Sequence, residues 1–191
     1  SPELKSSLSS LFITMLMSQC AMWAGQFATA KSLSSSDVAF FASAQRTATL
    51  ASFVLIAVNV VVAPKFAQAF AKGNQQEVNK LSLLSSRLMI ALAVPVLAFM
   101  IFFPEFLMGL FGEEYKVAAP LLQILAVGQF INVITGSVGY LLNMTGHEKD
   151  MRNVVLFSGP LAIVLAFGLT SQFGLTGAAY ATAISVASQN L

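Results

Sequence analysis

The chain has 191 residues and a net charge of +2, with ten Lys and Arg against eight Asp and Glu. Hydrophobic residues make up 57% of it and charged residues only 9%, and its mean hydropathy is +0.78; this composition excludes an ordinary soluble domain and favours a membrane protein. The charge is too small, and too little clustered with aromatic residues, to indicate a nucleic-acid partner.

Long uncharged runs predict the membrane-spanning helices, because a helix needs about 20 apolar residues to cross a bilayer. Five such runs occur, and the last, residues 153–191, is long enough for two helices. We therefore expect an all-α bundle in which residues 1–191 form a single lobe. Its six spans are expected at about 8–30, 38–63, 81–106, 117–143, 152–171 and 177–191. The chain stops inside an apolar pattern, so we expect a piece of a longer protein with its last helix truncated.

The second span has recognisable start and stop signals. Asp37 is expected to cap the helix, and Pro64 is expected to end it. Phe66 and Phe70 lie one helical turn apart, which predicts a short turn at the membrane interface with Gly73 as its stop.

The later spans have signals of the same kind. Asn74 followed by Glu77 predicts a capping box at the start of the helix that enters span three, and Pro95 is expected to kink that helix. Asp150 is expected to cap span five and Thr176 to cap span six.

The distribution of Lys and Arg predicts the orientation, because positively charged loops remain on the cytoplasmic side. If the N-terminus is cytoplasmic, only Lys31 and Lys116 lie on the outer side of the membrane. Arg46 is not counted, because it lies within a span. The cytoplasmic residues are then Lys5, Lys65, Lys72, Lys80, Arg87, Lys149 and Arg152. The polar cluster from His147 to Arg152 is therefore expected to be a cytoplasmic turn, and the protein is expected in a bacterial inner membrane.

Arg46 is the most informative single residue, because it lies inside the second span. A cation there costs from about 2.5 to more than 10 kcal/mol, depending on the estimate. It either faces a wet cavity and binds an anionic group bidentately, or reaches the headgroups or a neighbouring helix's carbonyls.

Five further side chains are candidates for substrate binding. Gln19, Trp23 and Gln26 share one face of the first span, and Gln129 and Asn132 share a face of the fourth. Amides beside an aromatic ring can bind a sugar by hydrogen bonds and stacking. The alternative is that these amides form hydrogen bonds between helices that hold the bundle together.

Small residues at four-residue spacing predict close approach of helix backbones. They are Gly128, Asn132 and Gly136 on the fourth span and Gly177, Ala181 and Ser185 on the sixth.

The sequence contains no pattern that indicates an enzyme. A nucleophile with a base, a metal-ligand spacing and a phosphate-binding glycine loop are all missing, so no catalytic residue, metal or cofactor is expected. Because no Asp or Glu lies well inside a span, ion coupling through an intramembrane carboxylate has no place in this part of the protein.

Four segments resemble the polysaccharide flippases of the multidrug/oligosaccharidyl-lipid/polysaccharide exporter superfamily. They are NVVVAPKFAQAFAKGN (59–74), LFGEEYKVAAPLLQILAVGQFINVITG (110–136), YLLNMTGHEKDMRN (140–153) and GLTGAAYATAI (174–184). Their order and spacing resemble the second half of such a transporter.

The resemblance implies two six-helix lobes around a central cavity and alternating access between the two sides of the membrane. It implies a substrate in which an oligosaccharide is carried on a polyprenyl pyrophosphate and is flipped from the cytoplasmic to the outer leaflet. The implied partners are this lipid-linked oligosaccharide, membrane lipids and the missing N-terminal lobe.

Three alternatives remain open at this stage. A multidrug antiporter of the same superfamily would need a more apolar cavity and a membrane carboxylate. An envelope glycan polymerase or ligase would need reactive groups near the interface, usually on a large outer loop. A membrane scaffold without activity would need no buried arginine.

Overall fold

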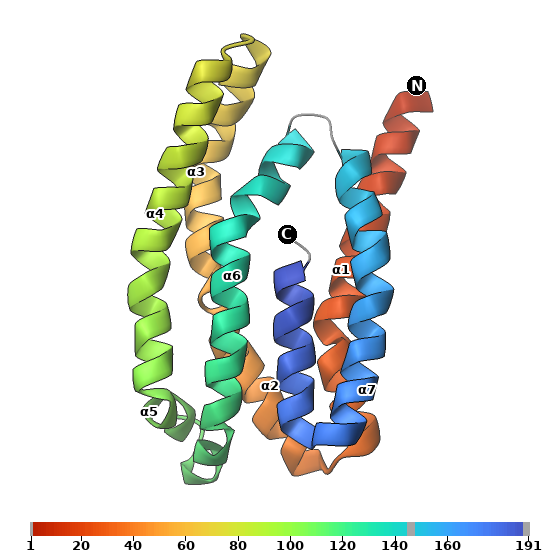
Figure 1. Cartoon of the computed structure of the whole chain (residues 1–191), viewed down its shortest axis with the longest axis vertical. Coiled ribbons are helices and arrows are strands. Elements are labelled where there is room, and N and C mark those ends of the chain that lie inside the picture. Colours follow the sequence, from red (N-terminus) through yellow and green to blue (C-terminus); the bar gives the residue numbers. More distant parts are fainter. Residues whose placement is uncertain (1, 145–147, 189–191) are drawn as a thin grey trace.

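The computed structural model describes the backbone of residues 2–144 and 148–188, and the side chains of residues 8–9, 12–135, 153 and 156–188. Across this described part the chain is helical and contains no strand, so the predicted all-α bundle is confirmed. Most of the helices run roughly parallel or antiparallel to one long axis (Figure 1).

Seven α-helices and one 3₁₀-helix follow one another in the described residues. They are α1 (Pro2–Ser32), α2 (Ser35–Thr49), α3 (Ser52–Ala71), α4 (Gln75–Phe102), α5 (Pro104–Gly109), η1 (Glu113–Ala118), α6 (Ala119–Met144) and α7 (Glu148–Ser188). Helix α7 is broken at Gly174, whose φ of 59° and ψ of −138° suit only glycine. The chain reverses there, so α7 consists of two limbs, 148–173 and 175–188 (Figure 1).

Four described segments are long and apolar enough to cross a membrane. They are Ser35–Ala71, Gln75–Phe102, Glu113–Thr135 and Leu156–Ser188. The last contains both limbs of α7, and the 31-residue helix α1 is not among the four. A multi-pass membrane bundle is therefore supported, while the number of six spans stays a prediction.

The start of α2 differs from the prediction. Ser34 is the N-cap, and its hydroxyl accepts a hydrogen bond of 3.2 Å from the backbone N–H of Asp37. The Asp37 carboxylate accepts a bond of 3.1 Å from the backbone N–H of Ser34. Asp37 is therefore the third-residue member of a capping box, because its side chain reaches back to the cap.

Pro64 does not end its helix, contrary to the prediction. Helix α3 continues to Ala71, and Gly73, with φ of 66°, follows its C-cap. The missing N–H of the proline is tolerated because Val62 and Phe66, on either side of it, are packed in a buried cluster with α4. Phe66 is thus part of the core and only Phe70 is exposed, so the two do not form a separate interfacial turn.

Asn74 is the N-cap of α4, as predicted, and its side chain accepts from the N–H of Glu77 at 3.1 Å. Helix α4 continues without a break past Pro95. Asp150 lies within the first turn of α7 rather than before it, and Gly174, not Thr176, separates the two limbs. Of the turn that was expected from His147 to Arg152, His147 lies outside the described residues, and residues 148–152 are already helical as the start of α7, contrary to the prediction.

Glycines let α6 and α1 approach the second limb of α7. A Cβ on Gly128 would lie 2.6 Å from Cα of Ala183, so the backbones of the two helices are in close contact. At Gly25 of α1 an added Cβ would instead meet side chains, the hydroxyl of Thr182 and the ring of Phe41. Close approach was predicted at Gly128, and this contact holds the helices that surround the site described next.

Candidate functional site

A polar cleft lies between α1, α2, α6 and the second limb of α7. It consists of two adjoining cavities, of about 430 Å³ and about 210 Å³, both bordered by Met22, Gln45 and Thr49. The larger cavity is also lined by Thr14, Met15, Ser18, Gln19, Ser52, Gln129, Asn132 and Val186. The smaller is also lined by Trp23, Gln26, Arg46, Leu50 and Phe53. Amides and hydroxyls thus gather around the larger cavity, whereas the lining of the smaller cavity, which Arg46 borders, is mostly apolar.

All six residues that the sequence singled out line this cleft. Trp23, Gln26 and Arg46 border the smaller cavity, and Gln19, Gln129 and Asn132 border the larger one. Side chains from three helices are therefore brought to one place, and their role in binding stays a prediction.

The packing of α1 determines which of its faces meets the cleft. Ala24 and Ala28 are buried in a cluster with the first and second limbs of α7. This contact fixes the rotation of α1 about its axis, and the helical period then leaves Gln19, Trp23 and Gln26 on the cleft side. The small alanine side chains allow the helices to pack closely. The position of Gln19, Trp23 and Gln26 in the cleft is therefore a consequence of how α1 packs against α7.

Gln45 is a central residue of the cleft that the sequence analysis missed. Its side chain is only 7% exposed. Its Nε2 donates to the backbone carbonyl of Met22 at 2.8 Å, and its Oε1 accepts from Nε2 of Gln26 at 3.1 Å. Gln45 therefore ties α2 to α1, and Gln26 takes part in this link as well as lining the cavity. The sequence does contain a signal for Gln45, because it is an amide side chain directly before Arg46 in an otherwise apolar span.

Arg46 lies in the last turn of α2, where a cation is favoured by the helix dipole. Its side chain is exposed, and it forms no hydrogen bond or ion pair with any residue that the structure describes. The neighbouring Gln45, by contrast, has hydrogen bonds at both its amide nitrogen and its amide oxygen. Of the two, only Arg46 keeps its donors available to something outside the described chain.

A break in the second predicted span shapes the same region. Residues 50 and 51 interrupt the helix between α2 and α3. Three hydroxyls bond backward to carbonyls around it, from Thr47 to Ser43, from Thr49 to Gln45 and from Ser52 to Thr49. Such back-bonding bends helices because it competes with the backbone's own hydrogen bonds. Leu50 and Ala51 keep helical dihedral angles, and the backbone bonds around them run to the third residue before instead of the fourth. Thr49 and Ser52, on either side of this stretch, line the larger cavity.

Gln129 and Asn132 form the α6 wall of the larger cavity. Nδ2 of Asn132 donates to Oε1 of Gln129 at 3.1 Å, and Gln129 is 8% exposed. The two amides thus orient each other one turn apart on the helix. Because the oxygen of the Gln129 amide is held by Asn132, the orientation of its amide nitrogen is fixed as well. An oriented amide of this kind suits the recognition of a hydroxyl-rich ligand.

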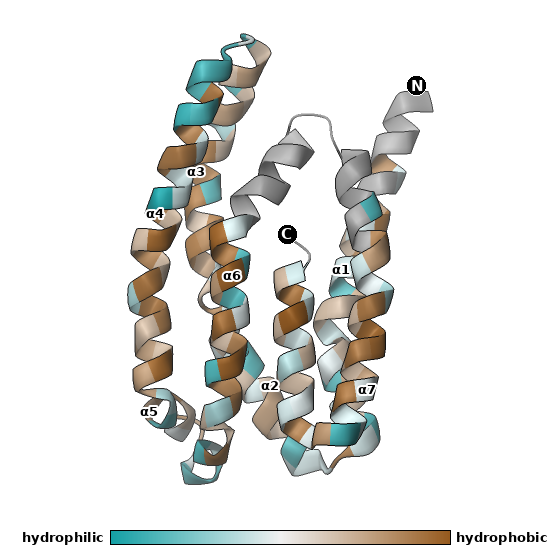
Figure 2. Cartoon of the chain, in the orientation of Figure 1, coloured by the Kyte–Doolittle hydropathy of each residue, from teal (hydrophilic) through white to brown (hydrophobic). Residues whose placement is uncertain are grey.

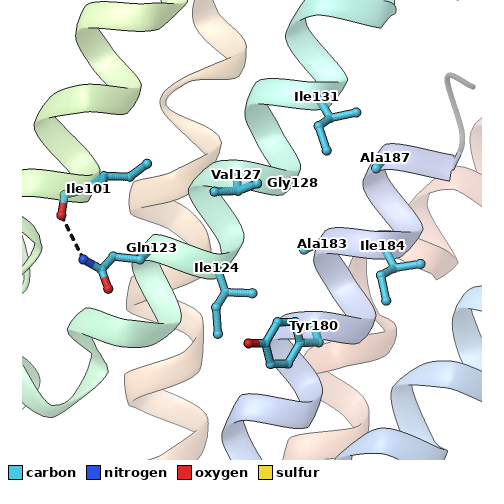
Figure 3. A pocket seen from close by; sticks show the side chains of 10 residues that line it. All are labelled: Ile101, Gln123, Ile124, Val127, Gly128, Ile131, Tyr180, Ala183, Ile184 and Ala187. Atoms are coloured by element: carbon cyan, nitrogen blue, oxygen red, sulfur yellow. Dashed lines mark hydrogen bonds between the residues drawn. The ribbon is translucent and has the colours of Figure 1, made fainter.

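The opposite side of α6 borders a different hollow, of about 530 Å³ (Figure 3). It is lined mainly by apolar side chains of α4, α6 and α7, including Ile124, Val127 and Ile131. Its single amide, Gln123, donates to the carbonyl of Ile101 at 2.8 Å. This hollow is larger than either cavity of the cleft, but no charged residue lines it, and its polar side chains are the paired amide of Gln123 and the hydroxyl of Tyr180.

Carboxylates of the described side chains lie at helix ends and in the links between helices. They are Asp37, Glu77, Glu105, Glu113 and Glu114. None of these carboxylates lines the polar cleft. Among the described side chains that do line it, only Arg46 is charged. The electrostatics of the cleft therefore favour an anionic ligand.

Comparison with known proteins places these features in a family. The sequence profile of the MatE family matches residues 8–168. The chain is 30% identical over 159 residues to the probable low-salt glycan biosynthesis flippase Agl15 of Haloferax volcanii. That match covers 81% of this chain and 33% of the relative, so the chain spans about a third of the relative's length. No solved structure gives a significant match.

Proposed function

The chain belongs to the MatE family, and from this premise we propose that it forms one lobe of a transporter that flips a lipid-linked oligosaccharide across the membrane. A second lobe, outside this chain, would face the polar cleft. Alternating access of the two lobes would expose the cleft first to the cytoplasmic side and then to the outer side. The substrate class is the part of this proposal that rests on the flippase relative.

The observation that carries the proposal is Arg46 in the polar cleft, which has no partner among the side chains that the structure describes. An arginine inside an apolar helix is costly unless it meets water or an anion. A guanidinium binds phosphate oxygens bidentately, with two parallel N–H···O bonds. The diphosphate that links a polyprenyl chain to a sugar is an anion of this kind, so we assign Arg46 to the diphosphate or to an acidic sugar.

The remaining cleft residues suit the sugar part of such a substrate. Trp23 borders the smaller cavity and is 45% exposed, so its ring has a free face on which a sugar ring can stack. Gln19, Gln129 and Asn132 line the adjoining cavity and supply amide donors and acceptors for hydroxyl groups. An oligosaccharide would then occupy the larger cavity with its diphosphate toward Arg46.

The charges at the two ends of the bundle bear on its orientation in the membrane. The turn between α3 and α4 lies at the opposite end of the bundle from α5 and the link that follows it (Figure 1). Lys65, Lys72 and Lys80 are near that turn in the sequence, and Glu113 and Glu114 belong to the link after α5. We propose that the lysine-rich end is cytoplasmic, in accord with the positive-inside rule. The N-terminus of α1 lies at the same end and would be cytoplasmic too.

The test is export of the lipid-linked sugar in cells whose only copy of the intact protein carries a substitution. Arg46→Ala should lower the amount of glycan reaching the outer leaflet by roughly 10- to 100-fold, the effect of losing a hydrogen-bonded charge pair. Arg46→Lys should retain part of the activity. Arg87→Ala is the matched control, because Arg87 lies on α4 away from the cleft, and it should export normally.

Normal export by Arg46→Ala at normal abundance would overturn the proposed role of Arg46. Loss of resistance to organic cations in cells lacking the protein, with glycan export intact, would overturn the substrate class and identify a multidrug antiporter instead. The cleft's single positive charge disfavours that alternative, because it repels cationic drugs.

A further inference from the structure

The hairpin formed by α3 and α4 has a hollow of its own, which shares no lining residue with the polar cleft. It has a volume of about 650 Å³ and lies beside the turn that contains Gly73. Figure 2 shows the tip of this hairpin as the hydrophilic end of two otherwise hydrophobic helices. Such a boundary between polar and apolar surface is where a membrane protein meets lipid headgroups.

Two lysines from different helices face this hollow. Lys65 precedes Gly73 by eight residues and Lys80 follows it by seven, so the antiparallel helices bring them to the same level of the hairpin. Both are exposed, and neither forms an ion pair with a residue that the structure describes. Two unpaired cations therefore converge on one hollow.

The acidic residue in the hollow does not neutralise them. Oε2 of Glu77 accepts from Nδ2 of Asn74 at 3.1 Å, and the Glu77 N–H is bonded to the Asn74 side chain. Glu77 is therefore engaged at the N-terminus of α4 rather than with Lys80, which lies three residues further along. With two lysines and one carboxylate, the hollow keeps a net positive charge.

Leucines form the apolar side of the same hollow. Leu81 and Leu84 line it next to Lys80, and Leu84 is 49% exposed. A free phosphate would gain nothing from these side chains. A phospholipid, by contrast, presents a phosphate to the lysines and the first part of an acyl chain to the leucines.

We propose that this hollow, bordered by Lys65, Lys80, Leu81 and Leu84, is a binding site for an anionic phospholipid. The phosphate group and any additional headgroup charge lie between the two lysines, and an acyl chain descends along Leu84. The bound lipid fixes the depth of the hairpin in the bilayer. This inference does not depend on what the protein transports.

Native mass spectrometry of the intact protein, released from nanodiscs and titrated with phosphatidylglycerol, tests the site. Wild-type protein should bind phosphatidylglycerol more tightly than phosphatidylcholine. The Lys65→Gln/Lys80→Gln variant should bind phosphatidylglycerol roughly 30-fold more weakly, the combined effect of two cations near an anionic lipid. Lys65→Arg/Lys80→Arg should bind as the wild type does.

Lys31→Gln/Lys72→Gln is the charge-matched control, because it removes two lysines that do not line the hollow. It should bind phosphatidylglycerol as the wild type does. Equal loss in both double variants would show that net charge alone attracts the lipid, and unchanged binding by Lys65→Gln/Lys80→Gln would show that the lipid sits elsewhere. Either result overturns the proposal, as would equal wild-type affinity for the two lipids. Glycan export is not measured, so failure here leaves the transport proposal standing.

Discussion

The two faces of α6 differ in how their polar groups are satisfied. On one face Gln123 is the only amide of the apolar hollow, and it is bonded to a carbonyl of α4 (Figure 3). On the other face the polar cleft contains bonded amides together with Arg46, which has no partner among the described residues. A membrane protein can bury an amide by pairing it internally, but an unpaired cation requires water or a ligand. The contrast is what marks the cleft, and not the hollow, as the functional side.

The contact that keeps the two faces apart gives the largest expected effect on stability. Gly128→Ala would place a methyl group 2.6 Å from Cα of Ala183, so α6 and α7 must separate. We expect a loss of about 1–3 kcal/mol, the usual cost of overpacking. Thermal unfolding of the purified protein in detergent measures it.

Gly168→Ala is the matched control for that prediction. A Cβ at Gly168 has no neighbour within 4 Å, so alanine there should raise stability by about 0.5–1 kcal/mol through its better helix propensity. Equal effects of the two substitutions would mean that α6 and α7 are not in close contact at Gly128.

Substitutions of two glutamines, one on each side of α6, distinguish an effect on bundle stability from an effect on transport. Gln45→Leu and Gln123→Leu each remove an amide that donates to a carbonyl of another helix at 2.8 Å. Both should lower stability by about 1 kcal/mol, the order measured for hydrogen bonds between membrane helices. Only Gln45→Leu should also reduce glycan export, because only Gln45 lies in the cleft. Equal export by the two variants would contradict the division between the two faces.

Part of the lining of the cleft could be predicted from the sequence, because polar residues are rare in the spans and helical spacing sorts them by face, but Gln45 was missed. Gln19, Trp23 and Gln26 follow one another at such spacing, and they lie where one packed face of α1 leaves them. Their convergence with Gln129 on α6 could not be predicted from periodicity, since it depends on how helices pack in three dimensions.

The helix boundaries show where local signals fail. Pro64 is a strong stop signal, yet packing of Val62 and Phe66 against α4 carries the helix past it. The interruption at residues 50 and 51 has no proline or glycine, and it coincides with hydroxyls of Thr49 and Ser52 that bond to backbone carbonyls. Tertiary packing overrode the stop signal of Pro64, whereas the interruption at residues 50 and 51 has no single strong signal in the sequence.

Cysteine accessibility tests the division of α6 most directly. In protein whose Cys20 is replaced by alanine, single cysteines are introduced as Asn132→Cys in the cleft and Val127→Cys in the apolar hollow. Both are treated in intact membranes with a charged, water-soluble maleimide. We expect rapid labelling at position 132 and little at position 127, because water reaches the cleft whereas lipid covers the hollow. Labelling of position 127 with protection of position 132 would contradict the assignment of the cleft as the functional side.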